Sequence, residues 1–125
     1  MIFSEKELAS VTKVAMAMAK ADGHLDKEES SVICSELMDF GIDTNEFVTI
    51  VTKSRLMDAS DAFKTISTMS MDKKQYVSGF LVAIMISDGN IEPNELKMWV
   101  LISSLAQLPE TTADKALLYY SSHKS

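Results

Sequence analysis

The chain has 125 residues, 46% of them hydrophobic, and 18 acidic against 12 basic side chains give it a formal net charge of −6. This length and composition suit one hydrophobic core, so we expect a single domain over residues 1–125. The sequence pI near 4.8 and the absence of any lysine and arginine cluster in the sequence argue against a nucleic-acid partner.

Capping signals and apolar periodicity predict a nearly all-helical chain, beginning with four helices. A capping box at residues 4–7 opens the first, and a second capping box at 26–29 opens the next. The third helix follows from Thr44, and a short fourth is capped by Asp58 or Ser60.

Three further helices are predicted in the C-terminal half. A capping box at residues 72–75 precedes a helix that is apolar on every side from 76 to 86, which should make it the central helix. Pro93 then stands at the first position of a sixth helix. A seventh follows Pro109, with a frayed tail expected from Ser121.

An offset of 66 residues lays the first three helices on the last three. The halves span about 4–56 and 70–122, and the fourth helix, about 58–69, connects them. The sequence therefore predicts an all-α, single-domain bundle of about seven helices with an internal three-helix pseudo-repeat.

The single cysteine, the N-terminal sequence and the longest apolar run indicate where in the cell the protein is found. Cys34 is the single cysteine, which excludes an internal disulfide and a cysteine-based zinc site, and its apolar neighbours predict a small core residue. The N-terminus lacks the layout of a signal peptide, and the longest apolar run, residues 80–86, is too short to span a bilayer. We expect a cytoplasmic protein without a transmembrane segment.

Two acidic loops hold the whole net charge. The first acidic loop is residues 22–29, Asp-Gly-His-Leu-Asp-Lys-Glu-Glu, and the second is residues 88–95, Asp-Gly-Asn-Ile-Glu-Pro-Asn-Glu. Together they contain seven acidic residues and one lysine, while the other 11 acidic and 11 basic residues cancel. Both share the pattern D-G-x-(Leu/Ile)-(Asp/Glu)-x-x-Glu.

Each loop matches the second half of an EF-hand calcium loop. The first half does not fit, because the positions that should supply oxygen are Met18 and Lys20 in one copy and Ile84 and Ile86 in the other. A hard cation such as calcium binds six to eight oxygen atoms, so the two loops could form a complete site only if they lie close together. The six candidate metal ligands are Asp22, Asp26, Glu29, Asp88, Glu92 and Glu95.

Helix capping explains most of the same residues without a ligand. Acids at a helix N-cap and third position are stabilising by about 0.5 to 2 kcal/mol each, and the two loop glycines would end helices in left-handed turns. Leu25 and Ile91 would then pin the chain to the core. Asp22 and Asp88 fit less well, since each faces the negative end of a helix dipole. Either an Asx turn or a cation would compensate them.

Two such helix-loop-helix units in a small acidic chain resemble the TerB family of tellurite-resistance proteins, whose fold is also similar to the N-terminal region of the membrane-anchored J-protein DjlA. The resemblance covers about residues 4–120. It implies a seven-helix bundle with an internal repeat, no established catalysis, a cytoplasmic or inner-membrane-face stress-response setting, and the six carboxylates above as a divalent-metal site. His24 and Asn90 after the glycines, and Lys20 and Lys27 beside the first loop, depart from the pattern.

Two functions follow as expectations, and neither is enzymatic. No phosphate-binding glycine loop, His-x-x-x-His pair or nucleophile elbow occurs in the sequence. In the first, the loops bind calcium or magnesium, with zinc less favoured although His24 could attract it. In the second, the acidic loops dock a protein partner with a basic surface, and the family analogy adds peripheral association with a membrane complex. A scaffold whose loops only cap helices is the third reading.

Overall fold

A computed structural model describes residues 2–20, 27–39, 42–87, 89 and 91–123, with the side chains of 27–30 and 39 left out of the description. Every regular element among these residues is an α-helix, as predicted. The seven helices are α1 (Glu5–Ala19), α2 (Lys27–Asp39), α3 (Thr44–Leu56), α4 (Ala59–Ser67), α5 (Met71–Met85), α6 (Pro93–Leu105) and α7 (Ala113–His123).

Side-chain caps set the starts of several helices. The Ser4 hydroxyl accepts the Glu7 amide at 3.1 Å while the Glu7 carboxylate accepts the Ser4 amide at 2.8 Å, which confirms the first capping box. The expected box at 72–75 is wrong. Helix α5 begins two residues earlier because the Ser70 hydroxyl already accepts the Lys73 amide.

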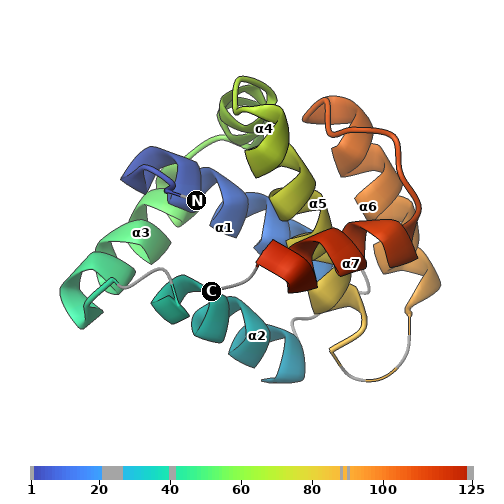
Figure 1. The fold of residues 1–125 in the computed structure, drawn as a ribbon. Helices are drawn as coiled ribbons and strands as arrows, with labels where there is room; N and C mark the ends of the chain where they lie inside the picture. The colour runs from blue at the N-terminus through green and yellow to red at the C-terminus, as the bar shows by residue number, and fades with distance from the viewer. Residues whose placement is uncertain (1, 21–26, 40–41, 88, 90, 124–125) are drawn as a thin grey trace.

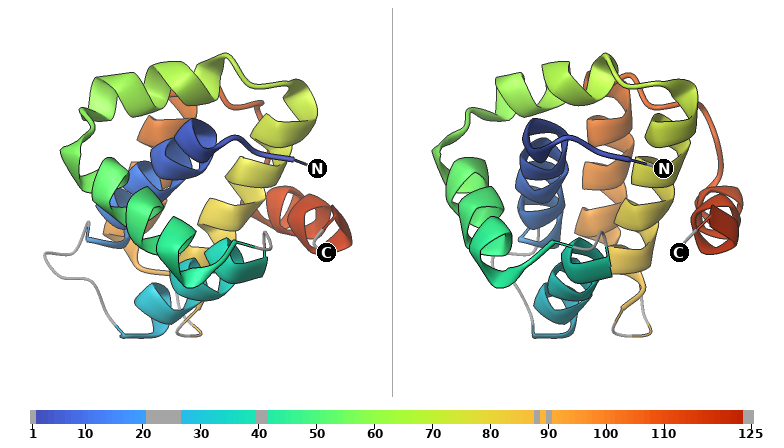
Figure 2. Two further views of the ribbon diagram at one scale, coloured as in Figure 1. Left: turned by 90° about the vertical axis from the view of Figure 1, so that its left-hand side faces the viewer. Right: turned by 60° about the vertical axis from the view of Figure 1, so that its left-hand side comes forward.

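Helices α1, α5 and α6 lie side by side in the middle of the bundle (right-hand view of Figure 2). Helix α3 flanks α1, and α7 flanks α5 on the opposite side; α4 crosses one end and α2 crosses the other (Figures 1 and 2). Most of α5 is buried, as expected for a central helix. Its largest fully buried side chains are Val77, Leu81, Val82, Ile84 and Met85.

Helix α7 approaches α5 at Gly79 more closely than any side chain would allow. A methyl group added at Gly79 would lie 2.2 Å from the carbonyl oxygen of Ala116 and 2.4 Å from Cβ of Tyr120. The Tyr120 ring then packs between those of Tyr76 and Phe80, with centroids 4.9 and 6.1 Å away. Glycine is therefore a packing requirement here.

The C-terminal segment is more ordered than a frayed tail. Helix α7 continues through His123, whose ring stacks on Tyr119 with centroids 3.9 Å apart. The Ser122 hydroxyl donates to the Leu118 carbonyl at 2.8 Å. These local contacts extend the helix beyond Ser121, where the sequence predicted its end.

The expected burial of Cys34 is also wrong, because the thiol is exposed. Helix α2 buries Ile33 and Leu37, and between them on the same face Glu36, which is 3% exposed. Cys34 is one residue, or 100°, beyond Ile33 and so lies off this stripe.

Among the described residues, no helix is long and apolar enough to cross a membrane. The helix order agrees with the three, one, three arrangement, while the internal pseudo-repeat itself stays a prediction.

Candidate functional site

The second acidic loop begins where α5 ends in a tight turn. The backbone N–H of Ile86, the C-cap residue, donates to the Val82 carbonyl at 3.1 Å, and the Gly89 N–H donates to the Ile86 carbonyl at 2.9 Å. Gly89 has φ of +90°, in the left-handed region that favours glycine. The predicted left-handed glycine of this loop is therefore confirmed.

The loop ends at α6, which starts as the sequence predicts. Pro93 occupies the first turn, and Glu92 is the N-cap, its carboxylate accepting the Asn94 amide at 3.3 Å. Glu95 follows one turn in and is only 3% exposed. The two carboxylates therefore differ: Glu92 is half-buried at the helix end, while Glu95 lies in the interior. Ile91, expected to be pinned to the core, is instead 46% exposed.

A tryptophan fixes α6 to α5 directly behind this loop. The indole N–H of Trp99 donates to the carbonyl oxygen of Ser78 at 3.3 Å, and the Trp99 side chain is buried. Trp99 is one helical turn beyond Glu95, on the same face of α6. The position of Glu95 is thus set by a buried contact between two central helices.

The first acidic loop lies mainly outside the described residues. Helix α1 ends at Ala19, where the Lys20 N–H donates to the Met16 carbonyl at 3.1 Å, and α2 begins at Lys27. The starts of α2 and α6, which follow the two loops, lie towards the same end of the bundle (Figure 2). The predicted ligands Asp22, Asp26 and Asp88 lie outside the described residues, as does the side chain of Glu29, and so do the loop residues Gly23, His24 and Leu25.

Two of the six predicted ligands, Glu92 and Glu95, have described side chains. Both are carboxylates, the oxygen donors that calcium and magnesium take. Within the described part of the chain, no three histidine, cysteine, aspartate or glutamate side chains gather as a metal site. Two carboxylates fall short of the six to eight oxygens of a calcium site, so any cation here would require acids of the loop segments as well.

Sequence reasoning missed the outer face of α6. Leu96 and Val100 are apolar residues of the kind that usually form a core, yet they are 38% and 58% exposed. Leu101 and Leu105 add two more exposed apolar side chains, and the buried residues of α6 are Glu95, Trp99 and Ile102 on the opposite side. Helix α6 carries more apolar residues than one buried stripe can hold, and this was the available signal. At 100° per residue, Leu96 and Val100 lie along one side of the exposed half of α6 and Leu101 and Leu105 along the other, with the exposed Lys97 between them. We call Leu96, Val100, Leu101 and Leu105 the α6 face.

A shallow hollow of about 560 Å³ borders the α6 face at its C-terminal end. It lies between the last two turns of α6 and the segment that leads to α7. Its walls are Trp99, Val100, Ser103, Ser104 and residues 107–111. Gln107 turns the chain there with φ of +56°.

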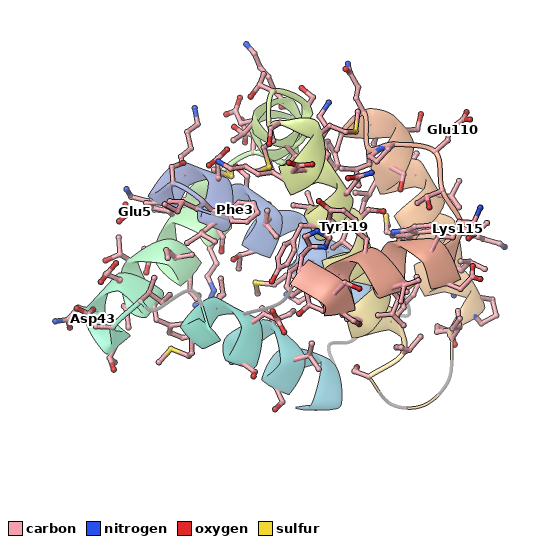
Figure 3. The ribbon with its side chains drawn as sticks, viewed as in Figure 1. Phe3, Glu5, Asp43, Glu110, Lys115 and Tyr119 are labelled. Carbon is pink, nitrogen blue, oxygen red and sulfur yellow. The ribbon has the colours of Figure 1, made fainter. Side chains whose placement is uncertain are left out.

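A smaller polar cavity of about 180 Å³ lies between α5 and α7. Glu110, Lys115 and Tyr119 contribute to its walls and are labelled in Figure 3. The Tyr119 hydroxyl donates to the Asp72 carboxylate at 3.5 Å. Burial, with the charge of Asp72 in addition, raises the pKa of Tyr119.

A solved structure of another protein has the same fold. No protein-family model and no curated protein matches the sequence. A solved structure does match: the protein of unknown function PG1108 from Porphyromonas gingivalis W83 is 38% identical, with a TM-score of 0.85 over 97% of this chain and 92% of that one. The chain belongs to the same family as PG1108. This agreement supports the all-helical fold and assigns no activity, and the TerB resemblance stays a prediction.

Proposed function

We propose that the chain is a non-catalytic, TerB-like binding module that docks a protein segment carrying both apolar and basic side chains. The observation that carries the proposal is the α6 face, four exposed apolar side chains in two pairs on either side of Lys97, beginning directly after the second acidic loop. The surface therefore offers apolar contact along the helix and negative charge at its N-terminal end.

The apolar part would supply most of the binding free energy. Exposed apolar patches beside polar borders are typical of protein interaction sites, and burying apolar surface contributes about 25 cal/mol for each Å². The neighbouring hollow, with Val100 in its wall, gives a partner side chain a place to insert. An amphipathic helix laid along α6 would use both features.

The acidic loops would set the orientation of the bound partner and the rate of association. The two acidic loops hold the entire net charge of −6. Basic residues at one end of the partner would be attracted to that end of the bundle, which speeds association and makes it weaken as salt is added. By analogy with the TerB family, we place such a complex in the cytoplasm or at the inner face of a membrane, in a stress response.

Site-specific photocrosslinking in the native host tests this proposal. A benzophenone amino acid replaces Leu101 on the α6 face or, as control, Leu118, which is 67% exposed on α7. We expect a crosslinked partner from position 101 only, lost in the variant Leu105→Ser and weakened by Glu92→Gln. The purified partner peptide should then bind with affinity that falls with salt.

Three results would contradict the proposal. The same products could form from positions 101 and 118, which would mean non-specific contact. The position-101 product could be a dimer of this chain, which would make the α6 face a self-association surface. The partner peptide could lack basic residues or bind without salt dependence, which would remove the role of the loops.

A second candidate function is the binding of a divalent cation, calcium or magnesium, by the acidic loops. The two carboxylates at the start of α6, the half-buried Glu92 and the buried Glu95 one turn behind it, favour it, because carboxylate oxygens are the donors that these ions take. Glu92 and Glu95 would hold the ion together with acids of the loop segments. The bound ion would neutralise negative charge and fix the loop against α6.

A further inference from the structure

A groove between α1 and α3 gathers three cationic side chains in this acidic protein. Lys13 in α1 and Lys20 at its C-cap are seven residues apart, about 10 Å along the helix axis. Arg55, in the last turn of α3, faces the same groove. The hollow measures about 470 Å³, and Met16, Ala17 and Ser54 complete its walls.

These three cations are unlike Lys53 and Lys73, which are held in ion pairs. On the same two helices Lys53 pairs with Glu5, and Lys73 of α5 pairs with Glu7. Lys13, Lys20 and Arg55 form no ion pair with any residue that the structure describes. Three like charges around one hollow repel each other, so an anion placed between them is favoured.

The residue types point to phosphate. A guanidinium binds two phosphate oxygens at once in its fork, and lysine ammonium groups add mobile point charges. The volume of about 470 Å³ exceeds what a bare phosphate fills and lies within the roughly 300–1,000 Å³ of small-molecule sites. Met16 and Ala17, between the two lysines on α1, would contact an organic portion.

We propose that the groove between α1 and α3 binds a small phosphorylated molecule that carries two or more negative charges. A nucleic acid fits less well, because three cations cover only a short stretch and the net charge of −6 repels a long polyanion. The headgroup of a phospholipid offers the same phosphate chemistry, so the experiment separates it from a soluble ligand.

Titration of the full chain with inorganic pyrophosphate, followed by backbone amide NMR shifts, is the first test. We expect shifts concentrated at residues 13–20 and 54–55. Removing two of the three charges with Lys13→Gln/Arg55→Gln should weaken binding by about tenfold. The matched control Lys64→Gln/Lys97→Gln removes the same charge from α4 and α6 and should bind like the parent. Thermal unfolding of both double variants checks that they fold.

Flotation with phosphatidylcholine vesicles that contain phosphatidylglycerol is the second test. Pyrophosphate binding without vesicle binding identifies a soluble ligand, and vesicle binding that Lys13→Gln/Arg55→Gln removes identifies a lipid headgroup. The proposal is overturned if neither probe binds, if both double variants lose binding equally, or if the shifts fall outside α1 and α3.

Discussion

The ammonium nitrogen of Lys73 lies 2.8 Å from the carboxylate of Glu7 and joins the start of α5 to the start of α1. The same carboxylate accepts the Ser4 amide in the capping box, and the Lys73 nitrogen lies 5.3 Å from the centre of the Phe3 ring. Both side chains are largely covered, with 18% and 23% exposed for Glu7 and Lys73. One carboxylate thus caps a helix and holds two central helices together.

Replacing Glu7 by glutamine should cost about 1 to 2 kcal/mol of unfolding free energy at neutral pH, because the ion pair and part of the cap are lost. The variant Glu5→Gln is the control. It breaks the pair of Glu5 with Lys53, whose side chains are 44% and 54% exposed, and should cost less than about 0.5 kcal/mol. Urea denaturation measures both. Equal losses would mean that burial of the Glu7 pair adds nothing.

The contribution of Glu7 should disappear in acid. Burial raises the pKa of Glu7, but the hydrogen bond and charge of Lys73 and the bonds from Ser4 outweigh it, so the pKa lies below its ordinary value of 4.5. A depressed pKa stabilises the fold above the unfolded-state value, and this stability is lost as the pH falls through the lowered folded-state value. The difference between Glu7→Gln and the parent should therefore vanish at low pH. A difference that persisted below pH 3 would contradict the assignment.

Two glycine substitutions should destabilise by different routes. Gly79→Ala places a methyl group against the Ala116 carbonyl and the Tyr120 side chain and should cost about 3 kcal/mol, with α7 losing amide protection first. Gly89→Ala meets no described atom within 4 Å, and its cost of about 1 to 2 kcal/mol should come from the φ of +90° alone. Hydrogen exchange distinguishes them, since only the first should expose α7.

Cys34 should react with a disulfide reagent in the native protein at a rate close to that of a small thiol, because it is exposed on α2. Cys34→Ser should change the unfolding free energy by less than about 0.5 kcal/mol. Absorbance of the released thiolate gives the rate. Reaction only after addition of denaturant would show that the thiol is covered.

Terbium luminescence excited through Trp99 should report an ion at the second acidic loop, since Trp99 is one turn beyond Glu95. We expect emission that calcium competes away and that Asp88→Asn or Glu92→Gln reduces, while Glu110→Gln, a change of the same type at an exposed site, leaves it unchanged. Lack of emission, together with no effect of millimolar calcium or magnesium on thermal stability, would end the metal proposal and leave the partner proposal standing.

The sequence predicted helix order well because caps are local. The start of α1 at Ser4 and of α6 at Pro93 depends on hydrogen bonds within one turn, which a short motif encodes. The predicted start of α5 was wrong for a local reason as well. Ser70 and Asp72 are both residue types that cap helices, and Ser70, two positions earlier, is the N-cap.

Burial was harder to predict because it depends on neighbouring helices. Leu96 and Val100 have the composition of core residues, but no described helix packs on that side of α6. The prediction that Cys34 is buried was wrong because the buried stripe of α2 includes Glu36, a charged residue that would be expected at the surface. The acidic loops could be identified from sequence, whereas whether they share an ion depends on side chains beyond the described residues.

The close approach at Gly79 has a consequence for synthesis. Because α5 leaves the ribosome before α7, its glycine notch and the rings of Tyr76 and Phe80 are exposed until the later segment arrives. In that interval a nascent chain presents a surface that fits the α7 of another copy as well as its own. Slow translation between residues 86 and 112 would lengthen this window for swapping the helix between neighbouring chains.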